Sequence, residues 1–337
     1  MYWKKQSSVI VLLLVLLIPL ATSYVGAQDP FWYQPHDASL ADNAYNQTSY
    51  FSLQWWYLDA TFNNSFSVHV GLLTIGAQAT NGFFLVQINI YDNGTLYAQR
   101  LSLIPLRLMS VSTQEPFVRY QGKELLQSYL NQDDRLCVAV NLTIKDLQVV
   151  LLFTGVTQGW IGTTNHGMWG CPLPRATVNG TLTIKGSQIP VHGSGYQEHG
   201  WDVRRLHRSW YWGKFTSNHM NVVFSQSMKN RWDEDVFLAM VNNPDNNYTS
   251  IQRKNISLVQ LKSMYSHGRF IPVESFLTIQ EGLYSIHVRL VVKSIDFKNL
   301  GLIHYWRFHA QITGVITYDG ISEEVNEVQI MEIFHLP

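Results

Sequence analysis

The chain has 337 residues, with 24 basic and 24 acidic side chains and a formal net charge of zero. Because binding to nucleic-acid phosphates needs a basic surface, this balance argues against nucleic acid as a partner. Charged residues make up 14% of the chain and aromatic residues 13%, which favours large apolar interiors or a lined cavity. The length exceeds what one core usually organises and predicts two domains.

Residues 1–27 have the pattern of an export signal. Lys4 and Lys5 precede the apolar run Val9–Leu20, which is too short for a comfortable membrane span, and Ala27 suits cleavage after it. The alternative is an uncleaved N-terminal anchor that associates the protein with a membrane. We therefore expect the protein outside the cytoplasm, secreted or anchored.

Seven asparagines head Asn-x-Ser/Thr triplets without proline at x, the acceptor pattern for N-glycosylation. Such triplets arise by chance, but this many after an export signal favour a secreted glycoprotein. The seven are Asn46, Asn63, Asn93, Asn141, Asn179, Asn247 and Asn255.

Cys137 and Cys171 are the two cysteines of the chain. In an oxidising compartment they can form a single disulfide, and the distance between them in the fold decides whether they do. The sequence has no Cys-x-x-Cys motif, so it supports neither a zinc knuckle nor a redox motif.

Alternation of apolar and polar residues with a period of two dominates the chain. In 84–90 the even positions are apolar, which predicts a half-buried strand, and Asp92-Asn93-Gly94 predicts the hairpin turn that follows. A second hairpin of this kind is expected at Asn179-Gly180. Helical signals are weak, and only 122–130 suggests one or two helical turns.

The same alternation recurs late in the chain. It covers 286–293 and 306–313, and Asp319-Gly320 predicts a turn before a closing strand at 328–332. Many short strands with regular turn signals predict an all-β fold, an antiparallel sandwich or barrel. The Gly193-Ser194-Gly195 break, near the middle of the mature chain, is the best candidate for a domain boundary. It divides the chain into residues 28–194 and 195–337.

Two aromatic clusters are candidates for a functional site, at 54–59 and at 193–213. On a strand, residues two apart share a face, so His199 and Trp201 project together and Glu198 projects to the opposite side. The adjacent Trp55 and Trp56 must likewise point to opposite faces. A histidine beside an indole gives a polar group in a π-rich wall that can hold a polyene or terpenoid and stabilise a carbocation.

These motifs resemble the carotenoid hydratase (hydroxyneurosporene synthase) family. The family pattern is a Pro-Arg, a Gly-x-Leu hairpin, Gly-x-Gly-Tyr-x-Asp/Glu-His-x-Trp and Trp-Tyr-Trp-Gly. The matching stretches here are 174–182, 193–201 and 210–213. Gln54-Trp55-Trp56-Tyr57 is similar to the family's opening Glu-Trp-Trp-Tyr, with glutamine in place of glutamate.

The resemblance implies two lipocalin-like antiparallel β-barrel domains packed together, with an apolar ligand bound near their junction. Members of the family differ in function, from water addition to polyketide cyclisation and lipid carriage, so the fold does not choose the reaction. The family's His-x-Trp pair corresponds to His199 and Trp201. Its Tyr-x-Asp on a following strand corresponds to 224–227, Phe-Ser-Gln-Ser, which has no carboxylate.

We expect a hydrophobic small molecule, such as an isoprenoid, polyene or lipid, as the ligand of a non-catalytic carrier. The alternative is an isomerase, cyclase or hydro-lyase that uses His199 and a nearby acid, Glu198. Histidines 192, 199 and 207 lie close in sequence, but strand parity separates them, so neither a metal nor a cofactor is expected. The expected ligand-binding residues are Trp55, Trp56, Tyr57, Tyr196, Trp201, Trp210 and Trp212.

Overall fold

The computed structural model describes most of the chain downstream of the expected export signal, and residues 1–27 lie outside the described part. Within that part no helix is long and apolar enough to cross a membrane. The described residues are 33–46, 53–78, 81–164, 167–203, 209–228, 236–300 and 303–335.

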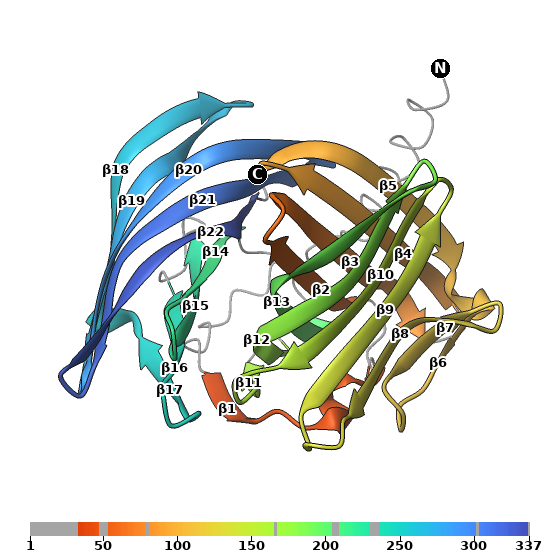
Figure 1. Cartoon of the computed structure of the whole chain (residues 1–337), viewed down its shortest axis with the longest axis horizontal. Helices are drawn as coiled ribbons and strands as arrows, with labels where there is room; N and C mark the ends of the chain where they lie inside the picture. Colours follow the sequence, from red (N-terminus) through yellow and green to blue (C-terminus); the bar gives the residue numbers. More distant parts are fainter. Residues whose placement is uncertain are drawn as a thin grey trace, which may run out of the picture.

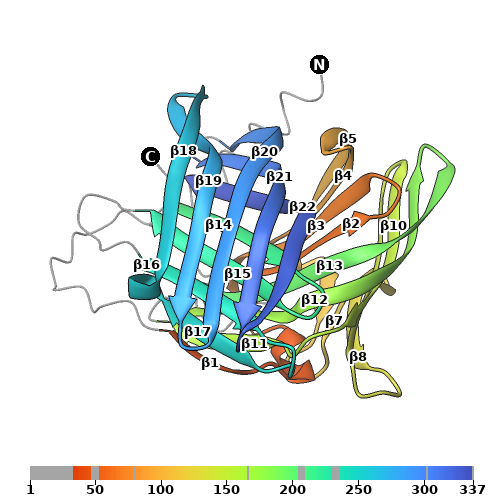
Figure 2. The ribbon, with the colours of Figure 1, turned by 60° about the vertical axis from the view of Figure 1, so that its left-hand side comes forward.

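The expected all-β fold with two barrel-like domains is confirmed: the described residues form two antiparallel sheets (Figures 1 and 2). The elements of the first sheet, with one short 3-10 helix before β2 and one after β5, are β1 (Tyr33–Asp37), η1 (Leu40–Asn43), β2 (Leu53–Phe62), β3 (Phe66–Gln78), β4 (Asn81–Asp92), β5 (Thr95–Pro105), η2 (Leu106–Leu108), β6 (Met109–Val111), β7 (Phe117–Tyr120), β8 (Lys123–Leu130), β9 (Leu136–Ile144), β10 (Leu147–Gly155), β11 (Trp160–Thr164), β12 (Gly167–Ile184) and β13 (Ser187–Val203). Those of the second sheet are β14 (Ser209–Thr216), β15 (Asn221–Met228), β16 (Val236–Asn242), β17 (Tyr248–Gln252), η3 (Arg253–Asn255), β18 (Ile256–Ser266), β19 (Arg269–Glu281), β20 (Tyr284–Leu300), β21 (Ile303–Tyr318) and β22 (Ile321–His335).

The first sheet curls around its own core, and we call it the first barrel. Its order is β5-β4-β3-β2-β13-β12-β10-β9-β8-β7-β6, with β1 and β11 paired beside β12. The second sheet has the order β17-β16-β15-β14-β22-β21-β20-β19-β18. Alternation explains both cores: Phe84, Val86, Ile88 and Ile90 are buried in the first, as predicted for 84–90.

Two predicted turns are confirmed. Asn93-Gly94 joins β4 to β5, and Asp319-Gly320 joins β21 to β22. All four residues have positive φ, between 48° and 78°, which is the backbone that a two-residue hairpin turn needs and that asparagine, aspartate and glycine adopt most readily.

The hairpin predicted at Asn179-Gly180 is wrong. Both residues lie inside β12, which pairs on one side with β10 and on the other with β13, and the chain turns at Lys185-Gly186 instead. Gly180 is there for a different reason: a Cβ at this position would lie 2.0 Å from the carbonyl oxygen of Val150. The glycine marks a close backbone approach between strands.

The helical turns suggested for 122–130 are also wrong, because this segment forms β8. It pairs with β7 and β9, and it buries Leu126 and Ser128 on one face. Long-range pairing outweighs the weak local preference for helix.

The proposed boundary between residues 194 and 195 lies within a continuous strand. β13 pairs with β12 over 187–201 and with β2 over 193–203, so residues 195–203 belong to the first sheet. The change of sheet comes between Val203 and Ser209. Gly193 and Gly195 allow close packing here, since a Cβ on Gly193 would lie 2.0 Å from the carbonyl oxygen of Thr61.

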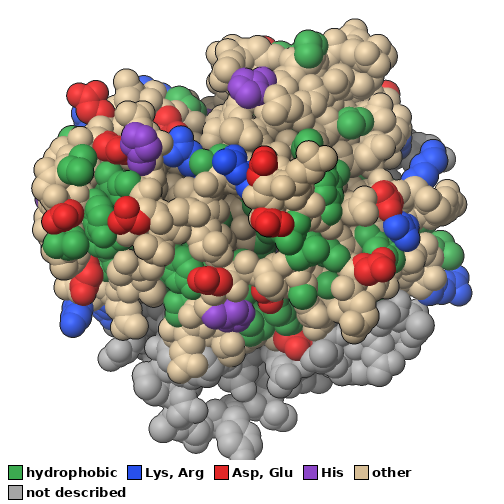
Figure 3. Space-filling view, turned by 60° about the horizontal axis from the view of Figure 1, so that its bottom comes forward, with side chains coloured by type: hydrophobic (Ala, Val, Ile, Leu, Met, Phe, Trp, Pro, Cys, Tyr) green, Lys and Arg blue, Asp and Glu red, His purple; other side chains and the backbone are tan. Residues whose placement is uncertain are grey.

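A third cluster of buried side chains lies between the two sheets. We call this region the junction. It receives residues from β1, β2, β11, β12 and β13 of the first sheet and from β14, β15 and β16 of the second. On the outside of the molecule, the face in Figure 3 shows acidic and basic side chains interspersed among small apolar patches.

Candidate functional site

Strand β13 carries the main candidate residues, and its two faces look into different parts of the molecule. Gln197 and His199 point into the first barrel, whereas Tyr196 and Glu198 point into the junction. The opposite orientation of His199 and Glu198 was predicted from the alternation, as was that of Trp55 and Trp56. Trp55 bonds to Glu198, and Trp56 stacks on His199.

Glu198 is a carboxyl group held by three aromatic donors. The indole N–H of Trp55 donates to Oε1 at 3.0 Å, the indole N–H of Trp169 donates to Oε2 at 3.3 Å, and the hydroxyl of Tyr196 donates to Oε2 at 2.8 Å. The pKa of Glu198 is raised to about 7: burial among these rings is the largest cause, the charge of Glu332 acts in the same direction, and the three hydrogen bonds oppose the rise.

Glu198 is surrounded by aromatic side chains but keeps part of its surface accessible to solvent. Its side chain is only half-buried, and so are those of Trp55, Trp169 and Trp210, although all of them lie where the two sheets face each other. A carboxyl that is desolvated enough to titrate near neutral pH and still reachable is a typical proton donor for catalysis.

Trp212 of β14 brings the second sheet to this site. Its ring lies 5.1 Å from that of Tyr196 and 5.5 Å from that of Tyr57, measured between ring centroids. Its indole N–H is buried and has no hydrogen-bond partner within the part of the chain that the structure describes. A buried donor without a partner is costly, and it is available to an acceptor on a bound molecule.

A buried ion pair joins the two sheets beside these rings. Lys214 Nζ lies 2.8 Å from Oδ1 of Asp59, and the hydroxyl of Tyr57 donates to Oδ2 of the same carboxylate. Burial raises the pKa of Asp59, and Lys214 counteracts that effect. The pair therefore cross-links β2 and β14 within the junction.

A second buried pair, Arg307 with Glu332, continues this polar region. Arg307 Nε donates to Glu332 Oε1 at 2.7 Å, and its other nitrogens donate to the hydroxyls of Tyr91 and Tyr305. Tyr91 belongs to the first sheet and donates in turn to Asp296 of the second. These contacts hold the two sheets in a defined orientation.

Sequence reasoning missed these charged residues as part of the site. Arg307 was read as a polar position alternating with core residues at 306–313, which predicts exposure on the second face, and it was not assigned to the site. In fact both faces of β21 are buried over 306–310: Trp306 and Phe308 lie in the core of the second sheet, and Arg307 and His309 lie in the junction. The available signal was the position of Arg307, a charged residue directly between Trp306 and Phe308 in an aromatic stretch of a chain with few charges.

His199 has a structural environment. Its Nδ1 lies 2.5 Å from the carbonyl oxygen of Asp42 and its Nε2 lies 2.8 Å from the amide nitrogen of Gln54. A carbonyl only accepts, so Nδ1 carries the proton and Nε2 accepts from Gln54. Burial lowers the pKa of His199 to about 3, and the ring stays neutral at physiological pH.

Two indole rings pack against this histidine. Trp56 stacks on it at 4.9 Å between ring centroids with an interplanar angle of 12°, and Trp201 lies at the same distance. With both ring nitrogens bonded and the side chain fully buried, His199 anchors η1 across the end of the first barrel.

The structure thus divides the predicted site residues into two groups. Glu198, Trp55, Tyr57, Tyr196 and Trp212 meet in the junction, and Trp210 packs at its margin, where its ring stacks on Phe334 at 4.0 Å. The rings of His199, Trp56 and Trp201 pack together in the first barrel.

The remaining sequence hypotheses have simpler outcomes. Cys137 and Cys171 are both free and buried. No group of three or more potential metal ligands occurs among the described residues. His192 bonds to Asn179, and His207 lies outside the described residues.

Comparisons with known proteins identify the fold. No family model and no curated protein matches the chain. An AttH protein from Nitrosomonas europaea is similar in structure, with a TM-score of 0.61 and 13% identity over 83% of this chain and 91% of that one. Kievitone hydratase from Nectria haematococca has a TM-score of 0.58 and 11% identity, and the match covers 89% of this chain and 93% of that one. CghA, solved with Sch210972, has a TM-score of 0.59 and 12% identity, and the match covers 85% of this chain and 88% of that one.

These similarities show a lipocalin-like fold built from two barrel-like units. At this level of identity they show the fold and not the reaction.

Proposed function

We propose that the protein is an acid–base enzyme, an isomerase, cyclase or hydro-lyase, acting on an apolar small molecule at the junction, with Glu198 as its proton donor. The observation that carries this proposal is the state of Glu198: a reachable carboxyl whose pKa is about 7, fixed among indole rings. Carriage alone needs an apolar cavity and gives no reason to bury a carboxyl at such cost.

The chemistry follows from the neighbours of Glu198. Protonation of an alkene or a polarised carbonyl places positive charge on the substrate, and the faces of Trp55, Trp169 and Trp212 can stabilise that charge. The hydrogen bond from Tyr196 keeps the carboxyl in one orientation, which supports transfer of its proton in one direction.

A second carboxyl, that of Glu332, lies near this site and is the proposed base. Glu332 stands opposite Trp212 in the pairing of β22 with β14, and Arg307 compensates its charge. Among the described residues Glu198 has no such ion pair and is held instead by the neutral donors Trp55, Trp169 and Tyr196.

The similar structures support this class of reaction. One of them is named a hydratase, and another was solved with a bound small molecule. The expected family acid at 224–227 is absent here, and Glu198 supplies a carboxyl from β13 instead.

We propose that the enzyme acts outside the cytoplasm. None of the seven sequon asparagines is buried, so a glycan at each is compatible with the fold. Five are exposed, namely Asn63, Asn93, Asn141, Asn179 and Asn247. The export-signal pattern of residues 1–27 supports the same proposal.

The test follows transfer of a proton to carbon. A panel of polyenes, terpenoids and enones is incubated with the protein in D₂O, and deuterium incorporation at carbon is followed by mass spectrometry. The parent should incorporate deuterium, Glu198→Gln should lose at least about a hundredfold in rate, and Trp212→Phe should retain part of the rate.

The matched control is Glu281→Gln, which removes a glutamate at the end of β19, outside the junction. It should react as the parent does. Equal rates for Glu198→Gln and the parent would refute the role of Glu198. Tight binding of a panel compound without turnover in any variant would instead establish the carrier function.

A further inference from the structure

The first barrel has a seam along one side. Strand β5 pairs only with β4, so its other edge has no strand partner among the described residues. Across this edge lie the turn between β9 and β10 and the strands β8 and β9. Two neighbouring pockets follow the seam, one beside residues 96–100 of β5 and one beside residues 101–104.

The larger pocket is an apolar groove of about 480 Å³. Its walls come from β4, β5, β7, β8 and β9, and Val86, Ile104 and Leu142 among its lining residues belong to the core of the first barrel. Leu101 and Leu103 remain half-buried at its rim. The groove therefore presents partly exposed apolar side chains next to the buried core of the first barrel.

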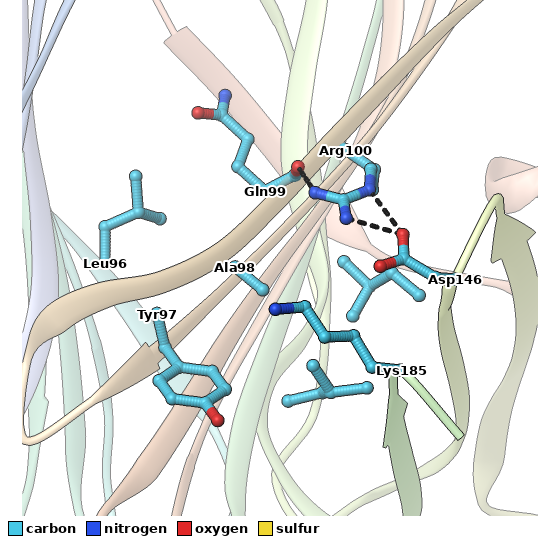
Figure 4. A pocket seen from close by; sticks show the side chains of 9 residues that line it. Leu96, Tyr97, Ala98, Gln99, Arg100, Asp146 and Lys185 are labelled. Carbon is cyan, nitrogen blue, oxygen red and sulfur yellow. Dashed lines mark hydrogen bonds and ion pairs between the residues drawn. The ribbon is translucent and has the colours of Figure 1, made fainter. Parts of the chain in front are cut away.

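The smaller pocket, about 420 Å³, carries charge (Figure 4). Arg100 of β5 bonds to Asp146 in the β9–β10 turn, and this ion pair is the polar link across the seam. Lys185, in the β12–β13 turn, lines the same pocket, and its charge lowers the pKa of Asp146 together with the hydrogen bond from Arg100, the largest cause.

Lys145 lines the apolar groove from the position next to Asp146. The seam thus has three cations and one carboxylate at its charged end, an excess of two positive charges beside an apolar channel. An elongated molecule with an apolar chain and one terminal anion matches both parts.

We propose that this seam binds a long-chain monocarboxylate, with the chain in the groove beside Leu101 and Leu103 and the carboxylate near Lys145 and Lys185. Pockets of this size accommodate small-molecule ligands. Unlike the junction, the seam has no acid with a raised pKa, so it holds the molecule without reaction. The proposal is independent of the proposed enzyme function, because none of the pocket-lining residues belongs to the junction.

The probe is hexadecanoate, measured by displacement of a fluorescent fatty acid from the whole protein, with hexadecanol as the uncharged analogue. Lys145→Asp and Lys185→Asp are combined. Both positions have positive φ, 59° and 51°, a conformation that aspartate tolerates, so the turns should form. The double variant should bind hexadecanoate about tenfold more weakly and hexadecanol as the parent does.

The matched control is Lys254→Asp with Lys293→Asp, which makes the same change of charge at exposed positions of the second sheet. It should leave the affinity unchanged. Asp146→Asn should increase the affinity severalfold, since it removes the one opposing charge.

Several results would overturn the proposal. One is equal hexadecanoate affinity in the Lys145/Lys185 variant and the parent; another is no binding by the parent. A third is that Trp212→Phe loses hexadecanoate binding while the variant with both Lys145→Asp and Lys185→Asp keeps it. That result would place the ligand in the junction. Leu103→Trp provides a test of the chain site: it narrows the groove at a half-buried position and should weaken both probes.

Discussion

Replacing Glu198 by glutamine tests the central electrostatic feature of the junction without reference to any substrate. Glutamine keeps the shape of the side chain but does not titrate. Because the pKa of Glu198 is raised from 4.5 to about 7, the folded protein retains a proton that the unfolded chain loses at lower pH.

The sign of the effect follows from this difference. The raised pKa contributes stability that is fully present below pH 4.5 and is lost as the pH rises through about 7. The rise in pKa corresponds to about 3 kcal/mol, so the free energy of unfolding of the parent should fall by about that much, relative to Glu198→Gln, between pH 4 and pH 9.

The measurement is differential scanning calorimetry of both proteins across this pH range. For a chain of this size the expected change in the difference between the two melting temperatures is about 5 °C. The variant should also melt at a lower temperature by an amount that does not depend on pH, because glutamine cannot accept all three hydrogen bonds that Trp55, Trp169 and Tyr196 donate. The change of the melting-temperature difference with pH, and not its size at any one pH, therefore reports the pKa of Glu198.

Glu323→Gln is the control of opposite sign. Burial alone would raise the pKa of Glu323, but hydrogen bonds from Ser217 and His219 lower it, so its contribution to stability is present at neutral pH and lost as the pH falls. The stability of the parent relative to Glu198→Gln must instead decrease as the pH rises. A flat difference between pH 4 and pH 9 would show that Glu198 titrates like an exposed carboxyl and would remove the basis for its catalytic role.

Other consequences of the structure can be measured directly. Lys214→Met should lower the free energy of unfolding by about 3–5 kcal/mol because it leaves Asp59 buried and unpaired, and adding Asp59→Asn should recover most of that loss in denaturant titrations. His199→Gln should cost about 1–3 kcal/mol of stability while the deuterium incorporation of the folded fraction stays at the parent rate, since His199 is fully bonded and away from the junction. Thiol titration in denaturant without reductant should find two free thiols per chain, from Cys137 and Cys171, and a value of zero would contradict the described fold.

Much of the local structure could be predicted from the sequence, because it depends on short-range rules. Alternation at 84–90 located a strand of the first core, and Asn93-Gly94 and Asp319-Gly320 located two turns by their tolerance of positive φ. The same rules failed at Asn179-Gly180, where the dipeptide suits a turn but strands on both sides keep the chain extended.

The candidate site shows where sequence reasoning stops. Alternation along β13 determined that Glu198 and His199 point in opposite directions, and the aromatic residues around them marked the segment as important. Which of the two faces receives a ligand was decided only by the tertiary structure. A strand that buries one face follows a simple alternating pattern, but β13 buries both, one in the first barrel and one against the second sheet.

The partners that define the junction come from distant parts of the chain. Asp59 meets Lys214, and Arg307 meets Tyr91, across more than 150 residues of sequence in each case. The sequence by itself therefore determined the all-β class, two turns and the opposite orientations of neighbouring residues such as Glu198 and His199. The packing of the two sheets determined which side is desolvated, and desolvation is the physical reason that an ordinary glutamate at position 198 has a pKa of about 7.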